Sequence, residues 1–231
     1  MSTLVQLTLQ SVGNSIWVGT PERQECGQTC FCQYMSSLLC DWEIENAILS
    51  NELIIKPFDK TLISSNSVDL RLGDQFLTYI KSDKTIDPYN AETIGNDVKT
   101  TWNAKTFTIY PGDFVLARTL EYIKLPDFYA ARVEGKSSLA RIGLTIHQTG
   151  GWIDSGFSGT ITLEISNVNV RPILLHAGMP ICQLAIFLTN PPRIPYDKKV
   201  GAKYNGQVEP TTSKYYQNTY NKKEKQWRQN L

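Results

Sequence analysis

The residues best suited to chemistry are concentrated in one segment, 133–164. A turn of basic and hydroxyl side chains, KSSLAR, occupies 136–141, and a glycine-rich loop that carries Asp154 follows at 150–159. A strand-like stretch then ends in a second acid, Glu164. Cations and hydroxyls bind phosphates, glycines let the backbone approach a ligand, and two acids can take different roles in proton transfer. The segment therefore indicates a nucleotide pocket.

Strands must position most of these residues. From residue 60 onward, short runs rich in Val, Ile, Leu, Thr and aromatic residues alternate with Pro, Gly, Asp and Asn turns, which is typical of a β-sandwich or barrel. One helix is predicted, at 40–51, with Asp41 as its N-cap. The tail from about Asp197 is polar, and we expect it to be mobile unless a ligand or a neighbouring subunit orders it.

Composition narrows the class of protein. The chain has 231 residues, of which 41% are hydrophobic and 19% charged, and these values fit a soluble globular protein. A net charge of +1 gives no basic excess for a nucleic-acid partner. No apolar run is long enough to span a bilayer, and no basic segment precedes the mildly apolar N-terminus as in a secretory signal. We expect a cytoplasmic protein with neither nucleic acid nor membrane as a partner.

Five cysteines are present, and three of them, Cys26, Cys30 and Cys32, are close together. They could hold a metal ion, but no histidine lies nearby and their spacing is not a usual zinc pattern. Reduced, incidental thiols of a cytosolic protein are the favoured interpretation.

The order of motifs resembles the dCTP deaminase branch of the trimeric dUTPase superfamily. The resemblance covers residues 35–213, and residues 1–34 have no counterpart, as an extension or an upstream translation start would explain. The matching blocks are residues 35–59, 67–73, 111–126, 133–144, 147–167, 178–184 and 195–213.

This resemblance implies an architecture. The fold is expected to be all-β, a distorted, jelly-roll-like barrel of the dUTPase type with one N-terminal helix. The deaminase domain is expected over 35–196, and a nucleotide-covering lid with a polar tail over 197–231. Family members assemble as homotrimers, with three sites at the subunit interfaces.

The loop before Asp154 separates activities within the family. Deaminase-only members carry a His-Arg pair before Ile-Asp, whereas bifunctional members carry Thr-Ala-Gly-aromatic-Ile-Asp. This chain reads Thr-Gly-Gly-Trp-Ile-Asp from Thr149, close to the bifunctional type but with Gly150 in place of alanine. Gly151, before the aromatic residue, is expected to leave room for water near the α-phosphate. The resemblance implies an enzyme that converts dCTP to dUMP and pyrophosphate for thymidylate synthesis. Two alternatives remain, a deaminase that releases dUTP and a nucleotide-sensing regulator without turnover.

Glu164 is implied as the catalytic residue, first as base toward water and then as acid toward the leaving ammonia. From residue types alone, Glu164 could equally face solvent on a strand, and Asp154 could simply form a turn before Gly156. Zinc deaminases activate water on a metal held by His and Cys. This chain has two histidines, no His-x-Glu and no Cys-x-x-Cys, so zinc is not expected. Mg²⁺ is expected instead, held by the triphosphate and water rather than by protein side chains.

The remaining site residues also come from the resemblance. Asp154 is expected to accept a hydrogen bond from the deoxyribose 3′-hydroxyl, and Arg141 either binds phosphate or forms an ion pair at a subunit interface. Tyr204 is expected to pack in the lid. The residues of the specificity loop, a region that responds to dTTP feedback in bifunctional relatives, are His147, Thr149, Gly150, Gly151 and Trp152. The other substrate-binding residues are Lys136, Ser137, Ser138, Leu139, Ala140, Thr162, Leu163, Gln183, Tyr196, Lys203 and Gln207.

Overall fold

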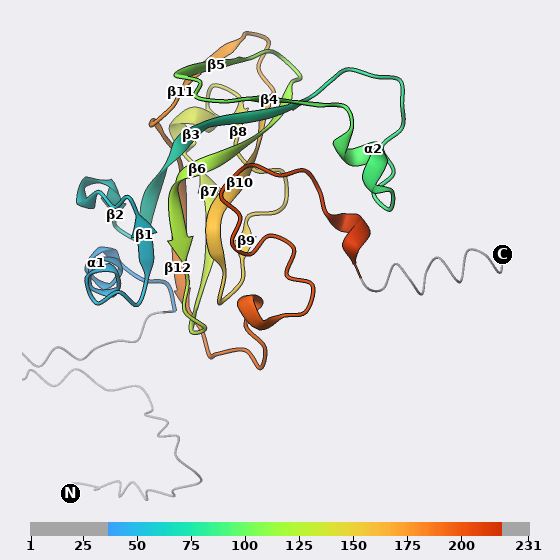
Figure 1. Cartoon of the computed structure of the whole chain (residues 1–231). Helices are drawn as coiled ribbons and strands as arrows, with labels where there is room; N and C mark the ends of the chain where they lie inside the picture. Colours follow the sequence, from blue (N-terminus) through green and yellow to red (C-terminus); the bar gives the residue numbers. More distant parts are fainter. Residues whose placement is uncertain (1–36, 219–231) are drawn as a thin grey trace, which may run out of the picture. The chain divides into compact units, whose positions relative to one another are not determined.

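The computed structural model describes residues 37–218 (Figure 1). Cys26, Cys30 and Cys32, the unmatched segment 1–34 and the last thirteen residues, 219–231, lie outside the described residues. The helices are α1 (Asp41–Leu49), α2 (Ala91–Gly95) and α3 (Ser137–Ala140), with 3-10 turns η1 (Lys60–Leu62), η2 (Tyr196–Lys198) and η3 (Tyr215–Gln217). The strands are β1 (Ile54–Lys56), β2 (Ile63–Ser64), β3 (Ser67–Tyr79), β4 (Val98–Thr101), β5 (Thr106–Ile109), β6 (Phe114–Lys124), β7 (Tyr129–Gly135), β8 (Leu144–Thr145), β9 (Trp152–Ile153), β10 (Ser158–Asn167), β11 (Ile173–His176) and β12 (Pro180–Leu188).

The strands form one curled antiparallel sheet in the order β8-β10-β6-β3-β12-β7-β9, with β1 on β6 and with β2 and β4 on β3. Strand β3 joins the two halves, because its first part pairs with β12 and its second part with β6. A smaller two-stranded sheet, β11-β5, lies at one end. The result is the predicted all-β, barrel-like architecture.

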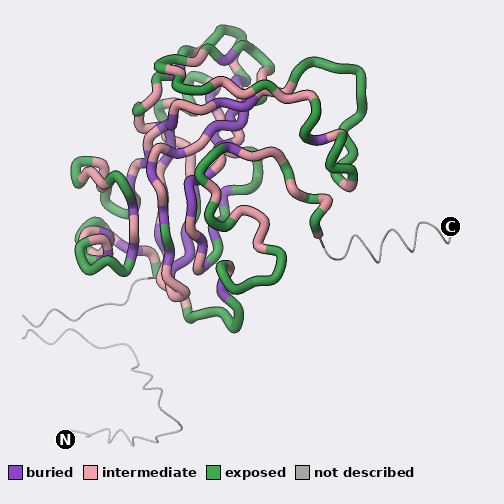
Figure 2. The backbone as a smooth tube through the Cα atoms, viewed as in Figure 1, coloured by how far each residue is buried: buried purple, intermediate pink, exposed green. Residues whose placement is uncertain are grey.

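Burial alternates along the central strands, as a sheet with one face on the core requires. In β10, Leu163 and Ile165 are buried and contribute to the core, while Thr162 and Glu164 alternate with them on the opposite face. Figure 2 shows buried backbone along the central strands and exposed backbone at the loops. The two faces of β10 therefore serve different purposes, and Leu163 offers only its backbone to a ligand.

The helices differ from the prediction in two respects. Helix α1 spans Asp41–Leu49, but its N-cap is Cys40 rather than Asp41, because the backbone N–H of Cys40 donates to Glu43 Oε2 over 2.8 Å. Two short helices were not predicted, and one of them, α3, lies within the KSSLAR turn. The predicted turn is thus a single helical turn that leaves β7. Within 37–218, no helix is long and apolar enough to cross a membrane.

The C-terminal segment packs against its own chain through residue 218. The backbone N–H of Gly206 donates to Ser158 O over 2.6 Å, and that of Thr160 donates to Gln207 O over 2.8 Å. Gly159, at φ +144°, allows this approach, since an added Cβ would lie 2.8 Å from Gln207 O. The tail was expected to be mobile unless a ligand or a neighbouring subunit orders it, whereas residues 197–218 are ordered by contacts with their own chain along β10. Residues 195–218 are called the lid below.

Candidate functional site

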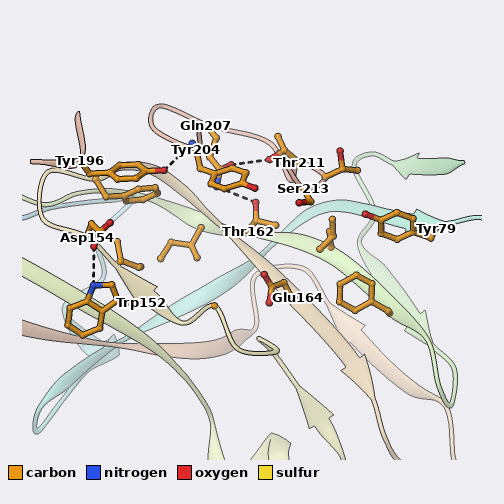
Figure 3. Close-up of a pocket in the computed structure, with 17 residues that line it drawn as sticks. Tyr79, Trp152, Asp154, Thr162, Glu164, Tyr196, Tyr204, Gln207, Thr211 and Ser213 are labelled. Carbon is orange, nitrogen blue, oxygen red and sulfur yellow. Dashed lines mark hydrogen bonds between the residues drawn. The ribbon is translucent and has the colours of Figure 1, made fainter. Parts of the chain in front are cut away.

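A cavity of about 480 Å³ lies between the outer face of β10 and the lid (Figure 3). Strands β6 and β10 provide its floor through Leu116, Thr162 and Glu164. The glycine-rich loop forms one wall, and the lid covers the cavity with Tyr196, Tyr204, Gln207 and Thr211–Ser213. Residues 150–213 thus contribute most of the lining, with additional residues from β3 and β6.

Glu164 is the half-buried acid at the base of this cavity. Its side chain accepts a hydrogen bond at Oε2 from the backbone N–H of Gln148 over 3.0 Å. The strand period directs it away from the core, and the lid covers the face on which it lies. The Gln148 N–H therefore orients the carboxylate on the face of β10 that lines the cavity.

The loop before Asp154 is fixed at both ends by backbone hydrogen bonds to two strands. At one end, Ile146 O accepts from the backbone N–H of Glu164 over 3.0 Å. At the other end, Gly151 O accepts from the backbone N–H of Val133 over 2.8 Å. These two hydrogen bonds place the Gln148 N–H beside the Glu164 carboxylate, so the backbone of the loop positions the acid.

The two adjacent glycines of this loop have different structural roles. Gly151 is buried and does not line the cavity, and an added Cβ would lie 2.8 Å from Val133 O. The absence of a side chain at Gly151 therefore allows the loop to approach the Val133 carbonyl, and the expected room for water near the α-phosphate stays a prediction. Gly150 does line the cavity, and an added Cβ would meet Glu164 Oε1 at 3.4 Å.

Asp154 forms the turn considered for it, and its carboxylate also reaches the cavity. Its backbone carbonyl accepts from the Phe157 N–H over 3.1 Å, closing a turn in which Gly156 has φ +83°. Its side chain lines the cavity and accepts at Oδ1 from the Trp152 indole N–H over 3.1 Å (Figure 3). The turn orients the carboxylate, and the indole holds it.

Hydrogen bonds connect the lid to the floor of the cavity. Gln207 Nε2 donates to Thr162 Oγ1 over 3.3 Å and to Thr160 O over 3.0 Å. The Tyr204 backbone N–H donates to the Tyr196 hydroxyl over 3.2 Å. Burial raises the pKa of the Tyr196 phenol, so this hydroxyl keeps its proton at neutral pH and can also donate to a ligand. These contacts hold the lid closed over Thr162.

The basic turn lies outside this cavity. Lys136 forms an ion pair with Asp69, and Ser137, Ser138 and Arg141 are exposed on or beside α3. Gln183 donates to Gly135 O over 3.4 Å, at the same end of β7. The expected phosphate-binding residues are therefore separate from the carboxylates within one chain.

Seven of the predicted catalytic, substrate-binding and specificity-loop residues line the cavity, as does Tyr204 of the lid, and twelve others do not. Lys203 donates to Asn218, and its pKa is lowered by burial and by the nearby charge of Lys199. His147 is half-buried, with Nδ1 lacking a hydrogen-bond partner in residues 37–218 and Nε2 3.9 Å from Glu134. The seven lining residues are Gly150, Trp152, Asp154, Thr162, Glu164, Tyr196 and Gln207. The predicted residues outside the lining are Lys136, Ser137, Ser138, Leu139, Ala140, Arg141, His147, Thr149, Gly151, Leu163, Gln183 and Lys203.

The sequence did not predict that two aromatic side chains form a wall of the cavity. Tyr79, at the end of β3, stacks on Phe114, at the start of β6, with ring centroids 6.1 Å apart. Phe157 and Ile161 complete the apolar lining. No motif marks these residues, because each reads as an ordinary strand or turn residue. The threonines of the lid lie in a matched block, which is the one signal that pointed to them.

A carboxylate oriented by a backbone N–H, in a cavity on a curled antiparallel sheet, forms a pocket that could support acid–base chemistry on a small molecule. The family model that matches residues 38–189 is described as dCTP deaminase-like. The chain therefore belongs to the dCTP deaminase-like family.

Named relatives agree with this assignment. A protein of Methanoregula boonei named dCTP deaminase, dUMP-forming, is 50% identical over 181 residues, 78% of this chain and 98% of the relative. A protein of the same name from Mycolicibacterium paratuberculosis is 47% identical over 184 residues, 78% of this chain and 97% of the relative. The solved 2′-deoxycytidine 5′-triphosphate deaminase of Agrobacterium tumefaciens matches at TM-score 0.54 and 21% identity, covering 67% of this chain and 48% of that one, and supports the fold. The predicted family and all-β fold are confirmed.

Proposed function

We propose that this protein deaminates dCTP and hydrolyses the resulting dUTP in the same pocket, releasing dUMP and pyrophosphate. The observation that carries the proposal is Glu164, oriented by the Gln148 N–H at the base of a lidded cavity. The names of the most similar relatives support dUMP as the product.

Deamination needs one base that later serves as an acid. Glu164 takes a proton from a water molecule as its oxygen forms a bond to C4 of cytosine. As the C4–N3 double bond opens, N3 gains the proton that the added hydroxyl gives up. The carboxyl returns its proton to the amine, the C4–N bond breaks as the C4 carbonyl forms, and ammonia leaves. The Gln148 N–H holds one carboxylate oxygen during both transfers, which lets the other oxygen face the reacting atoms.

Asp154 is proposed to bind the deoxyribose and to place the second water. Its carboxylate accepts from the 3′-hydroxyl, while the lid residues Tyr196 and Gln207 enclose the nucleoside. Water then attacks the α-phosphorus, the bond to the bridging oxygen of the β-phosphate breaks, and pyrophosphate leaves. Holding dUTP under the lid keeps both steps in one pocket.

Mg²⁺ is proposed to arrive with the triphosphate. Among residues 37–218, no group of three or more His, Cys, Asp or Glu side chains is placed to hold a metal ion. Phosphate oxygens and water are proposed to supply its ligands, because Mg²⁺ prefers oxygen ligands and keeps several waters. When bound, the ion neutralises charge on the leaving pyrophosphate.

We further propose that the active form is a homotrimer in which the basic turn serves a neighbouring subunit. Ser137, Ser138 and Arg141 are exposed and lie outside their own chain's cavity, which by itself supplies few cations for a triphosphate. A neighbour's α3 at the open end of the cavity would provide them. Lys136 and Gln183, which are also expected to bind the substrate, would do so in the same trimeric arrangement.

Product analysis tests the proposed activity. Purified protein is incubated with dCTP and Mg²⁺, and the nucleotides are separated by anion exchange. We expect dUMP with little free dUTP, loss of turnover on chelation, and restoration by added Mg²⁺ alone. Stoichiometric dUTP, with added dUTP left intact, would assign a deaminase alone, and binding without turnover would assign a regulator. Adding dTTP to the same assay tests whether it acts as a feedback inhibitor.

A further inference from the structure

The connection between β3 and β4 is longer than joining two adjacent strands requires. It runs from residue 80 to residue 97, although β3 and β4 pair directly with each other. Antiparallel neighbours are commonly joined by two to five residues, and long connections in compact proteins usually have a function. The segment 80–97, called the β3–β4 loop below, is therefore a candidate for a role beyond reversing the chain.

Internal contacts give the β3–β4 loop a defined shape. The Ile80 backbone N–H donates to Asp97 O over 2.8 Å and closes the base of the loop. Before α2, the Asp87 backbone N–H donates to Thr93 Oγ1 over 2.9 Å, and the Tyr89 backbone N–H donates to Asp87 Oδ1 over 2.9 Å. These hydrogen bonds fix the backbone from which the Tyr89 side chain extends.

Tyr89 contacts the end of the lid. Its ring lies edge-on to the ring of Tyr215 in η3, with ring centroids 5.6 Å apart and an interplanar angle of 79°. Residues 81–88 are exposed, whereas Tyr89 is half-buried. Figure 1 shows α2 beside the last turn of the lid, as this contact requires. The tyrosine pair thus joins the β3–β4 loop to the end of the lid.

Two lysines connect the tyrosine pair to the part of the lid that lines the cavity. Lys203 Nζ lies 6.0 Å from the centroid of the Tyr215 ring. The Lys214 backbone N–H donates to the Tyr204 hydroxyl over 3.0 Å, and Lys214 Nζ donates to Lys203 O over 2.8 Å. Tyr204 itself lines the cavity. Displacement of η3 would therefore disturb the part of the lid that encloses the ligand.

We propose that Tyr89 is a positioning residue that holds the lid closed, so that dUTP formed by deamination stays in the cavity until it is hydrolysed. This inference rests on the proposed two-step activity. Lid opening sets the rate at which many enzymes release a bound molecule. The fate of dUTP then depends on how fast the lid opens compared with hydrolysis. Tyr89 lies outside the cavity lining, so its side chain acts on this competition through the lid.

Two measurements on Tyr89→Ala test the inference. The initial ratio of dUTP to dUMP released from excess dCTP should rise by ~2–10-fold, as the loss of one aromatic pair allows. Amide hydrogen exchange at Gly206 and Thr160, measured without nucleotide, should accelerate by a similar factor, because these N–H groups bond between the lid and β10. Ile86→Ala is the matched control, since Ile86 is exposed in the same loop, and it should change neither quantity.

Variants of Tyr215 show whether Tyr89 acts through this contact. If it does, adding Tyr89→Ala to Tyr215→Ala changes neither the product ratio nor the exchange rates further. Tyr89→Phe keeps the ring and should lie closer to the wild type than to Tyr89→Ala. Unchanged exchange at Gly206 and Thr160 in Tyr89→Ala, or fully additive effects in the double variant, would overturn the inference.

The exchange measurement separates failure of this inference from failure of the proposed function. If the wild type leaves dCTP unchanged or forms dUTP alone, the proposed function is wrong, and exchange at Gly206 and Thr160 still decides whether Tyr89 holds the lid. If both products form and exchange accelerates in Tyr89→Ala while the product ratio stays constant, lid opening does not control the fate of dUTP and the inference is wrong.

Discussion

The acidic and the cationic regions of the proposed site are built differently. Glu164 accepts from a backbone N–H, lies half-buried and is covered by its own chain's lid. Lys136, by contrast, pairs with Asp69, and Arg141 is exposed beside a single helical turn. Proton transfer requires a base held within reach of the reacting atoms, and one chain alone orients the proposed base, Glu164. Phosphate binding requires cations at the open end of the cavity, whereas Lys136 and Arg141 of the same chain lie outside the cavity. The comparison suggests that each subunit completes the nucleobase end and relies on a neighbour for the phosphate end.

Removing the base should have the largest effect. Glu164→Gln keeps the shape of the side chain and can still accept from the Gln148 N–H, but it loses the proton acceptor. We expect ammonia release from dCTP to fall by ~10²–10⁴-fold while nucleotide binding survives. Glu92→Gln is the control, since Glu92 is exposed on α2 outside the cavity. Rapid ammonia release by Glu164→Gln would remove this residue from its proposed role.

The cationic region should show a smaller loss of activity that another subunit can rescue. Arg141→Ala should reduce kcat/KM for dCTP by ~10–100-fold, because a charge-assisted hydrogen bond to phosphate is lost. Co-refolding equal amounts of Glu164→Gln and Arg141→Ala should restore about a quarter of the wild-type rate, since that share of interfaces pairs two intact halves. No recovery in confirmed mixed trimers would place both halves of the site in one chain.

Weakening the lid should have an intermediate to small effect, mainly on substrate binding. Gln207→Ala removes the hydrogen bonds to Thr160 and Thr162. Two neutral hydrogen bonds of about 1 kcal/mol each predict a ~30-fold increase in KM for dCTP. Gln217→Ala is the matched control, because Gln217 is exposed in the same segment outside the cavity lining. Equal KM values for the two variants would show that the Gln207 contacts do not hold the nucleotide.

The smallest effect concerns pH. Lys203 has its pKa lowered, first by burial and then by the charge of Lys199. If Lys203 contacts the phosphates as a cation, kcat/KM declines as pH rises through this lowered pKa. Lys199→Ala removes the repulsion and raises the Lys203 pKa, so the alkaline limb of the kcat/KM profile should shift to higher pH. Lys198→Ala is the control. If the alkaline limb does not move, or moves to lower pH, Lys203 does not bind the substrate as a cation.

Local patterns in the sequence were sufficient for the fold and the family. Strands were predictable because residues alternate with period two wherever one face meets the core, as in β10. Helix α1 was predictable from its apolar spacing, although its cap was not. The family followed from blocks such as 133–144 and 147–167 in order. The domain boundaries at 34 and 196 remain predictions, as do the homotrimer and the roles of individual site residues.

Long-range packing decided the rest. Alternation in residues 161–165 permits Glu164 to face solvent or a pocket, and only the lid laid over β10 distinguishes the two. Gly150 and Gly151 look alike in the sequence, yet Gly150 lies next to the Glu164 carboxyl and Gly151 next to the Val133 carbonyl. The KSSLAR turn reads as part of the same pocket, but it leaves β7 outside the cavity. A residue's own type and its near neighbours determine which element it joins. What it faces depends on strands and segments distant in the chain, whose approach no local pattern encodes.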